Sequence, residues 1–184
     1  MLLVLPCFIA RAQEEDPDLQ YATELLKPGT EVPELKLNDL RGKSRTLSEF
    51  RGKKVVLVFW ATWCPDCRAE VPELKTMQAS ADPNKVAFVS VSFDRDFDTL
   101  CKFVEDNSLG GVQLFDPAGK KESKVGADFH VRWIPSLYLI DENGKVIIST
   151  VVAEKVAAQL KKEQSPLKNA MQKRGVCTEE GCCN

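Results

Sequence analysis

The chain has 184 residues, which is enough for one ordinary domain with modest tails. Its residues are 43% hydrophobic and 28% charged, with 10 Gly and 10 Pro, a composition that excludes a disordered chain, a collagen-like chain and a coiled coil. The 25 basic and 27 acidic residues leave a net charge of −2, so no strong positive field is present to hold nucleic acid or an anionic membrane.

The first residues have the order of a signal peptide. Residues 1–9 (MLLVLPCFI) form a short apolar run, Ala10-Arg11-Ala12 provides a cleavage site of the A-x-A type, and the polar stretch QEEDPD follows. The run is too short to span a bilayer as a helix of the mature protein. We therefore predict that residues 1–12 are removed on export and that the mature chain has no integral membrane span. No Lys or Arg precedes the run, so an apolar N-terminal tail is the alternative.

The stretch that follows carries weaker signals. Residues 13–27 are acidic and contain proline, which predicts a linker with one helical turn near residues 19–26. Residues 33–38 (PELKLN) alternate between polar and apolar and predict a strand. A turn at residues 41–43 and a short helical turn ending near Gly52 come next.

Two apolar runs indicate the centre of a β-sheet. Residues 55–60 (VVLVFW) and 86–93 (VAFVSVSF) predict strands that are buried on both faces. The residues between them predict a helix over 65–80, which makes the connection a right-handed parallel crossover.

The second half of the chain continues this alternation. A helix is predicted over 97–107, with Asp94 and Asp96 as candidate N-terminal caps. The remaining predicted elements are a strand at 113–115, a short helix at 120–127, strands at 136–140 and 145–151, and a closing amphipathic helix at 154–163. Asn143-Gly144 between the last two strands is a strong hairpin signal. This order predicts an α/β sandwich in which helices flank a mixed central β-sheet.

The candidate active site is the segment Trp63-Cys64-Pro65-Asp66-Cys67, where the first buried strand ends and a helix begins. A separation of three residues on the first helical turn brings the two sulfurs within bonding reach, and a helix start favours an anion. Pro65 suits the first helical position, where its missing N–H costs nothing. This arrangement suits thiol–disulfide exchange: the Cys64 thiolate attacks a disulfide, and Cys67 then attacks Cys64 and releases the reduced substrate.

Two structural roles for the same cysteines stay open at this point. A C-x-x-C pair can be half of a zinc site, but that needs a second pair of ligands. His130 is the only histidine and the chain has no second C-x-x-C, so we predict no metal at Cys64 and Cys67. A purely structural disulfide is the other alternative, which the strand–C-x-x-C–helix context disfavours.

Residues 54–72 (KVVLVFWATWCPDCRAEVP) resemble the active-site segment of the thioredoxin superfamily, F-W-A-x-W-C-x-x-C. Pro72 matches the proline that kinks the active-site helix of that family. Residues 133–136 (WIPS), followed by LYLIDENGKVI, resemble its cis-proline loop and closing hairpin. The resemblance covers about residues 28–163 and implies that these form a thioredoxin-like domain.

Within the superfamily, the opening PGTEVPELKLNDLRGKSRTLSEFRGK is similar to the TlpA/ResA-like branch and to redoxins of the peroxiredoxin type. The resemblance implies a thiol:disulfide oxidoreductase that works in the periplasm or elsewhere outside the cytoplasm, in solution or at a membrane. It needs no cofactor beyond the Cys64–Cys67 disulfide. Its partners would be protein thiols or disulfides and an upstream dithiol protein that donates electrons.

The resemblance also implies how the reacting cysteines are tuned. Thioredoxin has a buried aspartate where this chain has Val58, so Glu70, which matches a glutamate of the ResA-like reductases, is the candidate for handling the proton of Cys67. An anionic Asp66 opposes a thiolate at Cys64, which favours a reductant over a strong oxidant.

Three further residues are candidate substrate contacts. The resemblance implies a cis peptide bond before Pro135 and places the Ile134 backbone where it can pair with an extended substrate segment. Trp63 beside the first cysteine is expected to form a hydrophobic rim, with core packing as the alternative.

The tail at residues 164–184 carries the motif V-C-T-E-E-G-C-C-N, with Cys177, Cys182 and Cys183. A disulfide from Cys177 to one of the other two, a soft-metal site and disorder are the alternatives. A metal-binding or interaction module that uses this tail is therefore an alternative function. A redoxin-type peroxidase is another, although Thr62 stands two residues before Cys64 and not the usual three.

Overall fold

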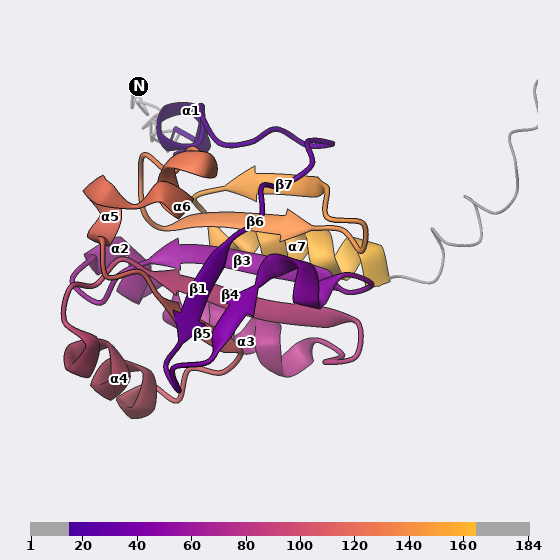
Figure 1. The fold of residues 1–184 in the computed structure, drawn as a ribbon. Helices are drawn as coiled ribbons and strands as arrows, with labels where there is room; N and C mark the ends of the chain where they lie inside the picture. Colours follow the sequence, from indigo (N-terminus) through magenta and orange to yellow (C-terminus); the bar gives the residue numbers. More distant parts are fainter. Residues whose placement is uncertain (1–14, 165–184) are drawn as a thin grey trace, which may run out of the picture.

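The computed structural model describes residues 15–164. Within this range, seven strands form one sheet in the order β2-β1-β5-β4-β3-β6-β7 (Figure 1). Three central strands run parallel: β3 (Lys54–Trp60), β4 (Val86–Ser92) and β5 (Val112–Phe115). Four strands pair antiparallel at the two edges: β1 (Lys36–Asp39), β2 (Ser44–Thr46), β6 (Ser136–Ile140) and β7 (Val146–Thr150). The predicted mixed α/β sheet is confirmed.

Strand β3 lies at the centre because its side chains are apolar on both faces. It pairs with β4 on one side and β6 on the other, and Val56, Leu57 and Phe59 have no exposed surface. Phe59 points to one face, where its ring centroid lies 5.8 Å from that of Phe93 and 5.2 Å from that of Phe129. The end of β3 is therefore held rigidly, and the candidate site begins there.

The opposite face of the sheet is covered by helices that follow β3 and β4. Helix α3 (Val71–Ser80) contacts α7 (Ala153–Gln164) behind the sheet in Figure 1. Helix α4 (Phe97–Asp106) places the Phe103 ring 5.6 Å from that of Trp60. These helices and the strands beneath them enclose the inner side of the candidate site.

The helix predicted over 65–80 is two helices. Helix α2 (Pro65–Ala69) ends at Glu70, and α3 starts at the next residue. Pro72 in the first turn of α3 has no N–H with which to continue the backbone hydrogen bonds of α2, and its ring crowds the preceding turn. The kink that the resemblance implies is therefore confirmed as a full break.

The short helix predicted over 120–127 is also divided, into α5 (Gly119–Glu122) and α6 (Lys124–Asp128). Ser123 separates them because its hydroxyl accepts the Gly126 N–H at 2.7 Å and so caps α6. Two elements near the N-terminus differ as well. The first strand begins at Lys36 and not at residue 33, and the short strand β2 was not predicted. The 3-10 helix η1 (Leu47–Phe50) confirms the predicted short helical turn.

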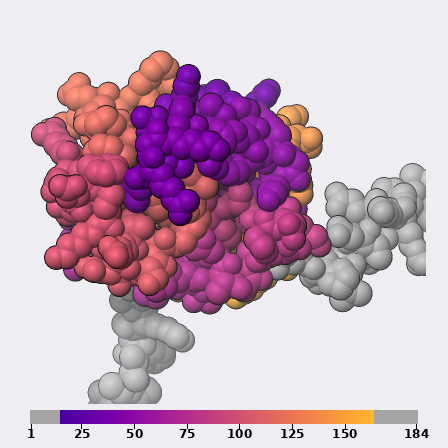
Figure 2. All heavy atoms as spheres, turned by 60° about the horizontal axis from the view of Figure 1, so that its bottom comes forward, coloured from indigo at the N-terminus to yellow at the C-terminus, as the bar shows by residue number. Residues whose placement is uncertain are grey.

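The segment predicted as a linker packs against the domain. It contains α1 (Asp18–Tyr21), and the following Leu25 side chain is only 1% exposed. The Leu26 N–H donates to the Tyr138 hydroxyl at 3.2 Å, and the Leu26 carbonyl accepts from the Ser149 hydroxyl at 2.8 Å. In Figure 2 this segment and the β1–β2 hairpin (indigo to purple) form a continuous surface with the rose and salmon atoms of the later helices. The helical turn predicted near residues 19–26 is present as α1, but its docking could not be predicted because the partners Tyr138 and Ser149 lie far along the chain.

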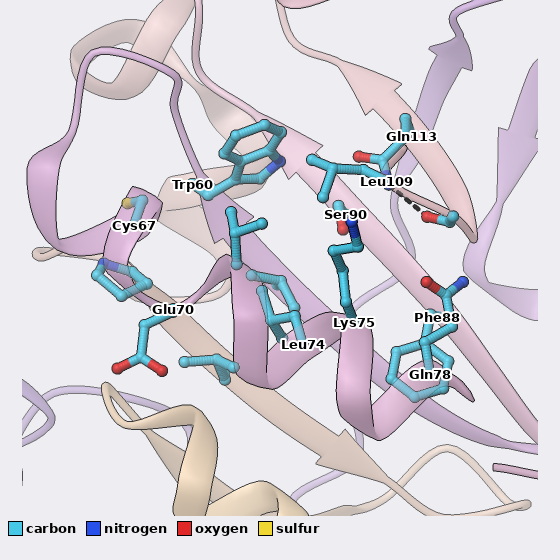
Figure 3. Close-up of a pocket in the computed structure, with 15 residues that line it drawn as sticks. Trp60, Cys67, Glu70, Leu74, Lys75, Gln78, Phe88, Ser90, Leu109 and Gln113 are labelled. Carbon is cyan, nitrogen blue, oxygen red and sulfur yellow. Dashed lines mark hydrogen bonds between the residues drawn. The ribbon is translucent and has the colours of Figure 1, made fainter. Parts of the chain in front are cut away.

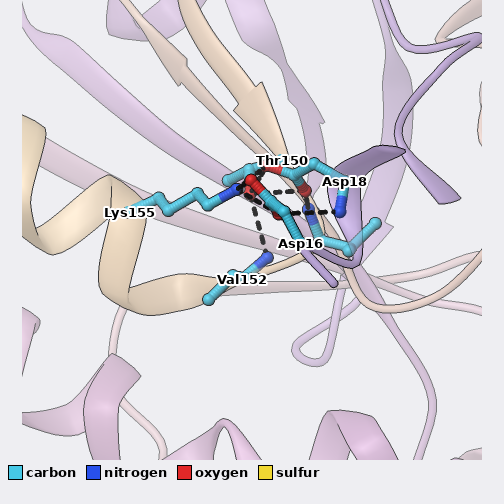
Figure 4. A network of polar contacts seen from close by, with 6 residues as sticks. Asp16, Asp18, Thr150, Val152 and Lys155 are labelled. Carbon is cyan, nitrogen blue, oxygen red and sulfur yellow. Dashed lines mark hydrogen bonds and ion pairs between the residues drawn. The ribbon is translucent and has the colours of Figure 1, made fainter. Parts of the chain in front are cut away.

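A polar network fastens the same segment to α7 (Figure 4). Lys155 binds Asp16 at 2.6 Å and also contacts Asp18, which accepts the Thr150 hydroxyl and the Val151 N–H, each at 2.8 Å. Burial lowers the pKa of Lys155, but its hydrogen bonds to the two carboxylates outweigh burial and raise the pKa overall. The hydrogen bond from Lys155 lowers the pKa of Asp16 below its usual range.

We expect Lys155→Met to loosen this attachment. Amide exchange of residues 18–26 should become about fivefold faster, the scale of one exposed ion pair. Because the folded pKa of Asp16 is depressed, its contribution is present above the unfolded pKa and is lost as the pH falls through the folded value. In the wild type the protection factors of these amides, which compare each exchange rate with the intrinsic rate at the same pH, should therefore be smaller at about pH 3 than at about pH 7, whereas the variant should show a smaller difference. Equal pH dependence in the two proteins would contradict the assignment.

Candidate active site

The two cysteines of the C-x-x-C motif lie where β3 gives way to α2. Cys64 is the N-cap of α2 with an extended backbone, and Pro65 occupies the first turn. Both thiols are nearly covered, with exposed fractions of 5% for Cys64 and 2% for Cys67. The predicted position of the pair at a strand–helix junction is confirmed, and both are free thiols in this structure.

The Cys64 sulfur contacts two backbone groups. It accepts the Cys67 N–H at 3.3 Å, and its S–H donates to the Ile134 carbonyl at 3.5 Å. The Ile134–Pro135 peptide bond is cis, as the resemblance implies. The fold thus brings the loop before β6 directly against the C-x-x-C motif, although 70 residues separate Cys64 from Ile134.

Cys67 lies deeper than Cys64. Burial raises the pKa of the Cys67 thiol, and its hydrogen bond with Cys64 raises it further, so this thiol keeps its proton at neutral pH. The two cysteines therefore have different environments: one sulfur sits at the helix start beside a loop, and the other sits beneath it.

A cavity of about 40 Å³ lies under the active-site helix, which is room for a small number of waters (Figure 3). Cys67, Glu70, Trp60 and Pro135 line it together with apolar side chains of β3, α3 and β4. The Trp60 indole N–H is buried and has no hydrogen-bond partner among the described residues, so the cavity wall includes a free donor.

Glu70 lines this cavity but does not bond to Cys67. In Figure 3 its carboxylate points away from the Cys67 sulfur, and Oε2 accepts the Ala153 N–H at the start of α7 at 3.3 Å. Burial raises the pKa of Glu70, and the nearby Glu154 and Glu73 raise it further. A half-buried carboxyl whose pKa is raised holds its proton to a higher pH than an exposed carboxyl does.

Asp94 belongs to the site, although the sequence predicts it only as a candidate cap of α4. Asp96 alone is that cap and accepts the Asp98 N–H at 3.2 Å. Asp94 is buried and accepts the Thr62 N–H at 3.0 Å, the Thr62 hydroxyl at 2.7 Å and the Ser92 hydroxyl at 2.6 Å. It thereby fixes the backbone just before the C-x-x-C motif. No local pattern signals this contact, because Asp94 and Thr62 are 32 residues apart.

The exposed rim of the site is aromatic. The Trp63 side chain is 58% exposed beside Cys64, which fits the predicted rim and not a core position. Trp133 is 38% exposed and stacks on Tyr21 with ring centroids 4.3 Å apart. Asp66 is exposed in the first turn of α2. The structure therefore places Trp63, Cys64, Ile134 and Pro135 together, with Cys67 and Glu70 on the inner side.

Cys101 is a partly buried free thiol on α4, and burial raises its pKa. Between residues 15 and 164, no cluster of three or more His, Cys, Asp or Glu side chains is arranged to hold a metal ion. The same part of the chain contains no helix that is both long and apolar enough to cross a membrane. Cys7 and the three tail cysteines lie outside the described residues.

Residues 28–149 match the AhpC/TSA family. The chain belongs to the AhpC/TSA family. It is 32% identical over 124 residues to the thioredoxin-like protein YneN of Bacillus subtilis, and the aligned region covers 66% of this chain and 69% of YneN. It is 31% identical over 141 residues to the thiol-disulfide oxidoreductase ResA of Bacillus cereus, and that aligned region covers 77% of this chain and 76% of ResA.

Solved structures of thiol-disulfide oxidoreductases and related proteins have a similar fold. The thioredoxin domain of a thiol-disulfide oxidoreductase from Bacteroides vulgatus superposes with a TM-score of 0.70 at 25% identity, covering 76% of this chain and 99% of that one. A putative thiol:disulfide interchange protein DsbE from Chlorobium tepidum gives a TM-score of 0.66 at 29% identity, covering 75% and 95%. This AhpC/TSA-family protein is a thiol-disulfide oxidoreductase with a thioredoxin-like fold, as the sequence predicts.

Proposed function

We propose that the protein exchanges disulfides with other proteins through Cys64 and Cys67 and acts as a reductant. The observation that carries the proposal is the environment of the Cys64 sulfur, which accepts the Cys67 N–H at 3.3 Å at the start of α2. A backbone N–H directed at sulfur stabilises a thiolate there. Cys67, held beneath it with a raised pKa, is suited to act second.

In the proposed reaction the Cys64 thiolate attacks one sulfur of a substrate disulfide, and the other substrate sulfur leaves and takes up a proton. Cys67 then loses its proton and attacks Cys64, which breaks the mixed disulfide and forms the Cys64–Cys67 bond. Two electrons pass to the substrate. An upstream dithiol protein would return the pair to its reduced form, so no cofactor other than this disulfide is needed.

Substrate binding is proposed for the rim beside Cys64. The exposed Trp63 side chain offers an apolar contact, and the Ile134 backbone lies against the reacting sulfur, where an extended segment can add as a short strand.

The residues between the two cysteines are proposed to tune the site. Pro65 sets the first turn of α2, and the anionic Asp66 disfavours a strongly stabilised thiolate, which is the reason for proposing a reductant. The proposed setting is outside the cytoplasm, and its support is the signal-like order of residues 1–12.

The decisive test uses Cys67→Ser. The variant should accumulate a mixed disulfide between Cys64 and a protein substrate such as insulin, visible by non-reducing electrophoresis and peptide mass, because no second thiol can release it. Cys101→Ser is the matched control and should turn over like the wild type. Failure of the variant to form any adduct would overturn the proposal, and hydrogen peroxide consumption that survives Cys67→Ser would favour the peroxidase alternative.

The direction of the reaction is tested by the reduction potential of the Cys64–Cys67 pair. A potential of about −270 mV or below would fit a reductant, and a potential of about −120 mV would fit an oxidant.

Glu70 is proposed to move the proton of Cys67 across the cavity that both residues line. Because burial raises the pKa of Cys67, release of the mixed disulfide should speed up as the pH rises. Glu70→Gln should slow that release by about tenfold to a hundredfold near neutral pH and remove the low-pH limb of the profile. Single-turnover release measured from about pH 5 to about pH 9 checks this, with Glu73→Gln on α3 as control. Identical pH profiles for wild type and Glu70→Gln would contradict a proton-transfer role.

A further inference from the structure

A groove beside the active site carries positive charge that the proposed reaction does not use. Its lining includes Arg95, Lys120, Lys121 and Arg132. Arg132 pairs with Glu24 at 2.9 Å, whereas the other three form no ion pair within residues 15–164. The groove therefore offers unpaired cations to an incoming segment.

The acidic side chains of the groove do not cancel this charge. Asp94 is buried and bonded to Thr62 and Ser92, and Asp96 is engaged as the cap of α4. With Arg132 paired to Glu24, the other three cations stand against these two carboxylates, which still leaves one positive charge in the lining. A segment that binds here should therefore carry carboxylates.

The groove borders the C-x-x-C motif. Its lining includes Thr62 and Trp63, the two residues before Cys64, and also Val131 and Arg132, which precede the Ile134 loop. A chain that places a cysteine against Cys64 can thus continue into the groove. Residues two or three positions along such a chain would lie about 7–10 Å further on.

This chain itself contains a segment with the required chemistry. The motif C-T-E-E-G-C-C at residues 177–183 places Glu179 and Glu180 two and three residues after Cys177. With Cys177 at the active site, these two carboxylates lie on the stretch of chain that would enter the groove, and their charge is opposite to that of the groove cations.

The connection to the domain is long enough for this placement. Helix α7 begins at Ala153, whose N–H donates to Glu70 at the end of α2, and it runs for 12 residues, or about 18 Å, to Gln164. From the end of α2 to its N-cap Cys64 is about a further 9 Å. The 13 residues from Gln164 to Cys177 can span up to about 43 Å, which exceeds the sum of these distances.

We infer that the segment of residues 177–183 docks in this groove and is a disulfide-exchange partner of Cys64 and Cys67. This inference rests on the proposed function. The segment would carry electrons between the buried pair and outside proteins, which gives the tail cysteines a role. Because the segment is on the same chain, it meets Cys64 at an effective concentration of about millimolar, which an unlinked partner rarely reaches.

The Cys64 thiolate attacks Cys177 of a disulfide between Cys177 and Cys182 or Cys183, and the released thiolate takes up a proton. Cys67 gives up its proton and attacks Cys64, which frees Cys177 as a thiol and closes the Cys64–Cys67 bond. Two electrons and two protons pass from the buried pair to the tail, and the reverse reaction returns them.

The test uses the full chain with Cys67→Ser, mildly oxidised and then quenched with N-ethylmaleimide. Peptide mass mapping should find a Cys64–Cys177 disulfide in the monomer, formed at a rate that does not change with protein concentration. Adding Arg95→Glu and Lys121→Glu should slow its formation by about tenfold, and raising the salt should act in the same direction. Lys36→Glu with Lys43→Glu, an equal charge change at exposed positions outside the groove, should leave the rate unchanged.

Three outcomes would overturn the inference. An adduct found only in dimers, with a rate that rises with protein concentration, would assign the groove to a second copy of the chain. No adduct, in a protein whose Cys64 still reacts with oxidised glutathione, would exclude the tail and leave the proposed function intact. An adduct insensitive to Arg95→Glu and Lys121→Glu would exclude docking in the groove. If Cys64 reacts with no disulfide at all, the proposed function itself fails.

Discussion

Cys64→Ser is expected to abolish thiol–disulfide exchange, with a fall in rate of about a thousandfold or more. A serine hydroxyl at the N-cap of α2 keeps the helix start but cannot form the mixed disulfide on which both proposed steps depend. Reduction of insulin, followed as turbidity with a dithiol donor, is the measurement.

Cys101→Ser provides the comparison for this variant, because Cys101 is a partly buried thiol on α4 that takes no part in the site. It should retain wild-type activity. If Cys64→Ser kept more than about a tenth of the activity, another group would have to be the nucleophile.

Phe59→Ala is expected to lower the free energy of unfolding by about 3–5 kcal/mol. Phe59 has no exposed surface and packs against Phe93, Phe129 and Tyr138, with ring centroids 5.8, 5.2 and 6.2 Å away. Removing the ring leaves a cavity that rigid neighbours on a central strand cannot close. Urea unfolding followed by tryptophan fluorescence gives the value.

Phe97→Ala is the matched control, because it removes the same ring from a side chain that is 39% exposed and contacts Phe115. We expect a loss of about 1 kcal/mol or less. Similar losses for the two variants would mean that the Phe59 cluster does not anchor β3, and the rigid support of the Cys64 loop would have to come from elsewhere.

Local patterns were sufficient for the parts of the site that are close in sequence. The continuous apolar run of β3, the proline after Cys64 and the spacing of the two cysteines all act within a few residues, so the strand–cysteine–helix unit could be predicted. The cis bond before Pro135 came from the resemblance and is present in the structure.

Contacts between distant segments could not be predicted in the same way. β2 has only three residues and exists because it pairs with β1. The carboxylate of Glu70 meets the N–H of Ala153 across 83 residues, and no periodicity in either segment indicates it. The docking of residues 18–26 could not be predicted for the same reason, because Tyr138, Ser149 and Lys155, which hold this segment, lie far along the chain.

The amino-acid sequence by itself determined the order of strands and helices, the burial of the central strands and the placement of Cys64 at a helix start, because apolar spacing and helix-start chemistry operate over short stretches of chain. Only the tertiary structure decided which groups surround the two sulfurs. Asp94 against Thr62, Ile134 against Cys64 and the cations of the groove come from segments far apart in the chain, and they meet because the packing of the sheet brings its loops to one end.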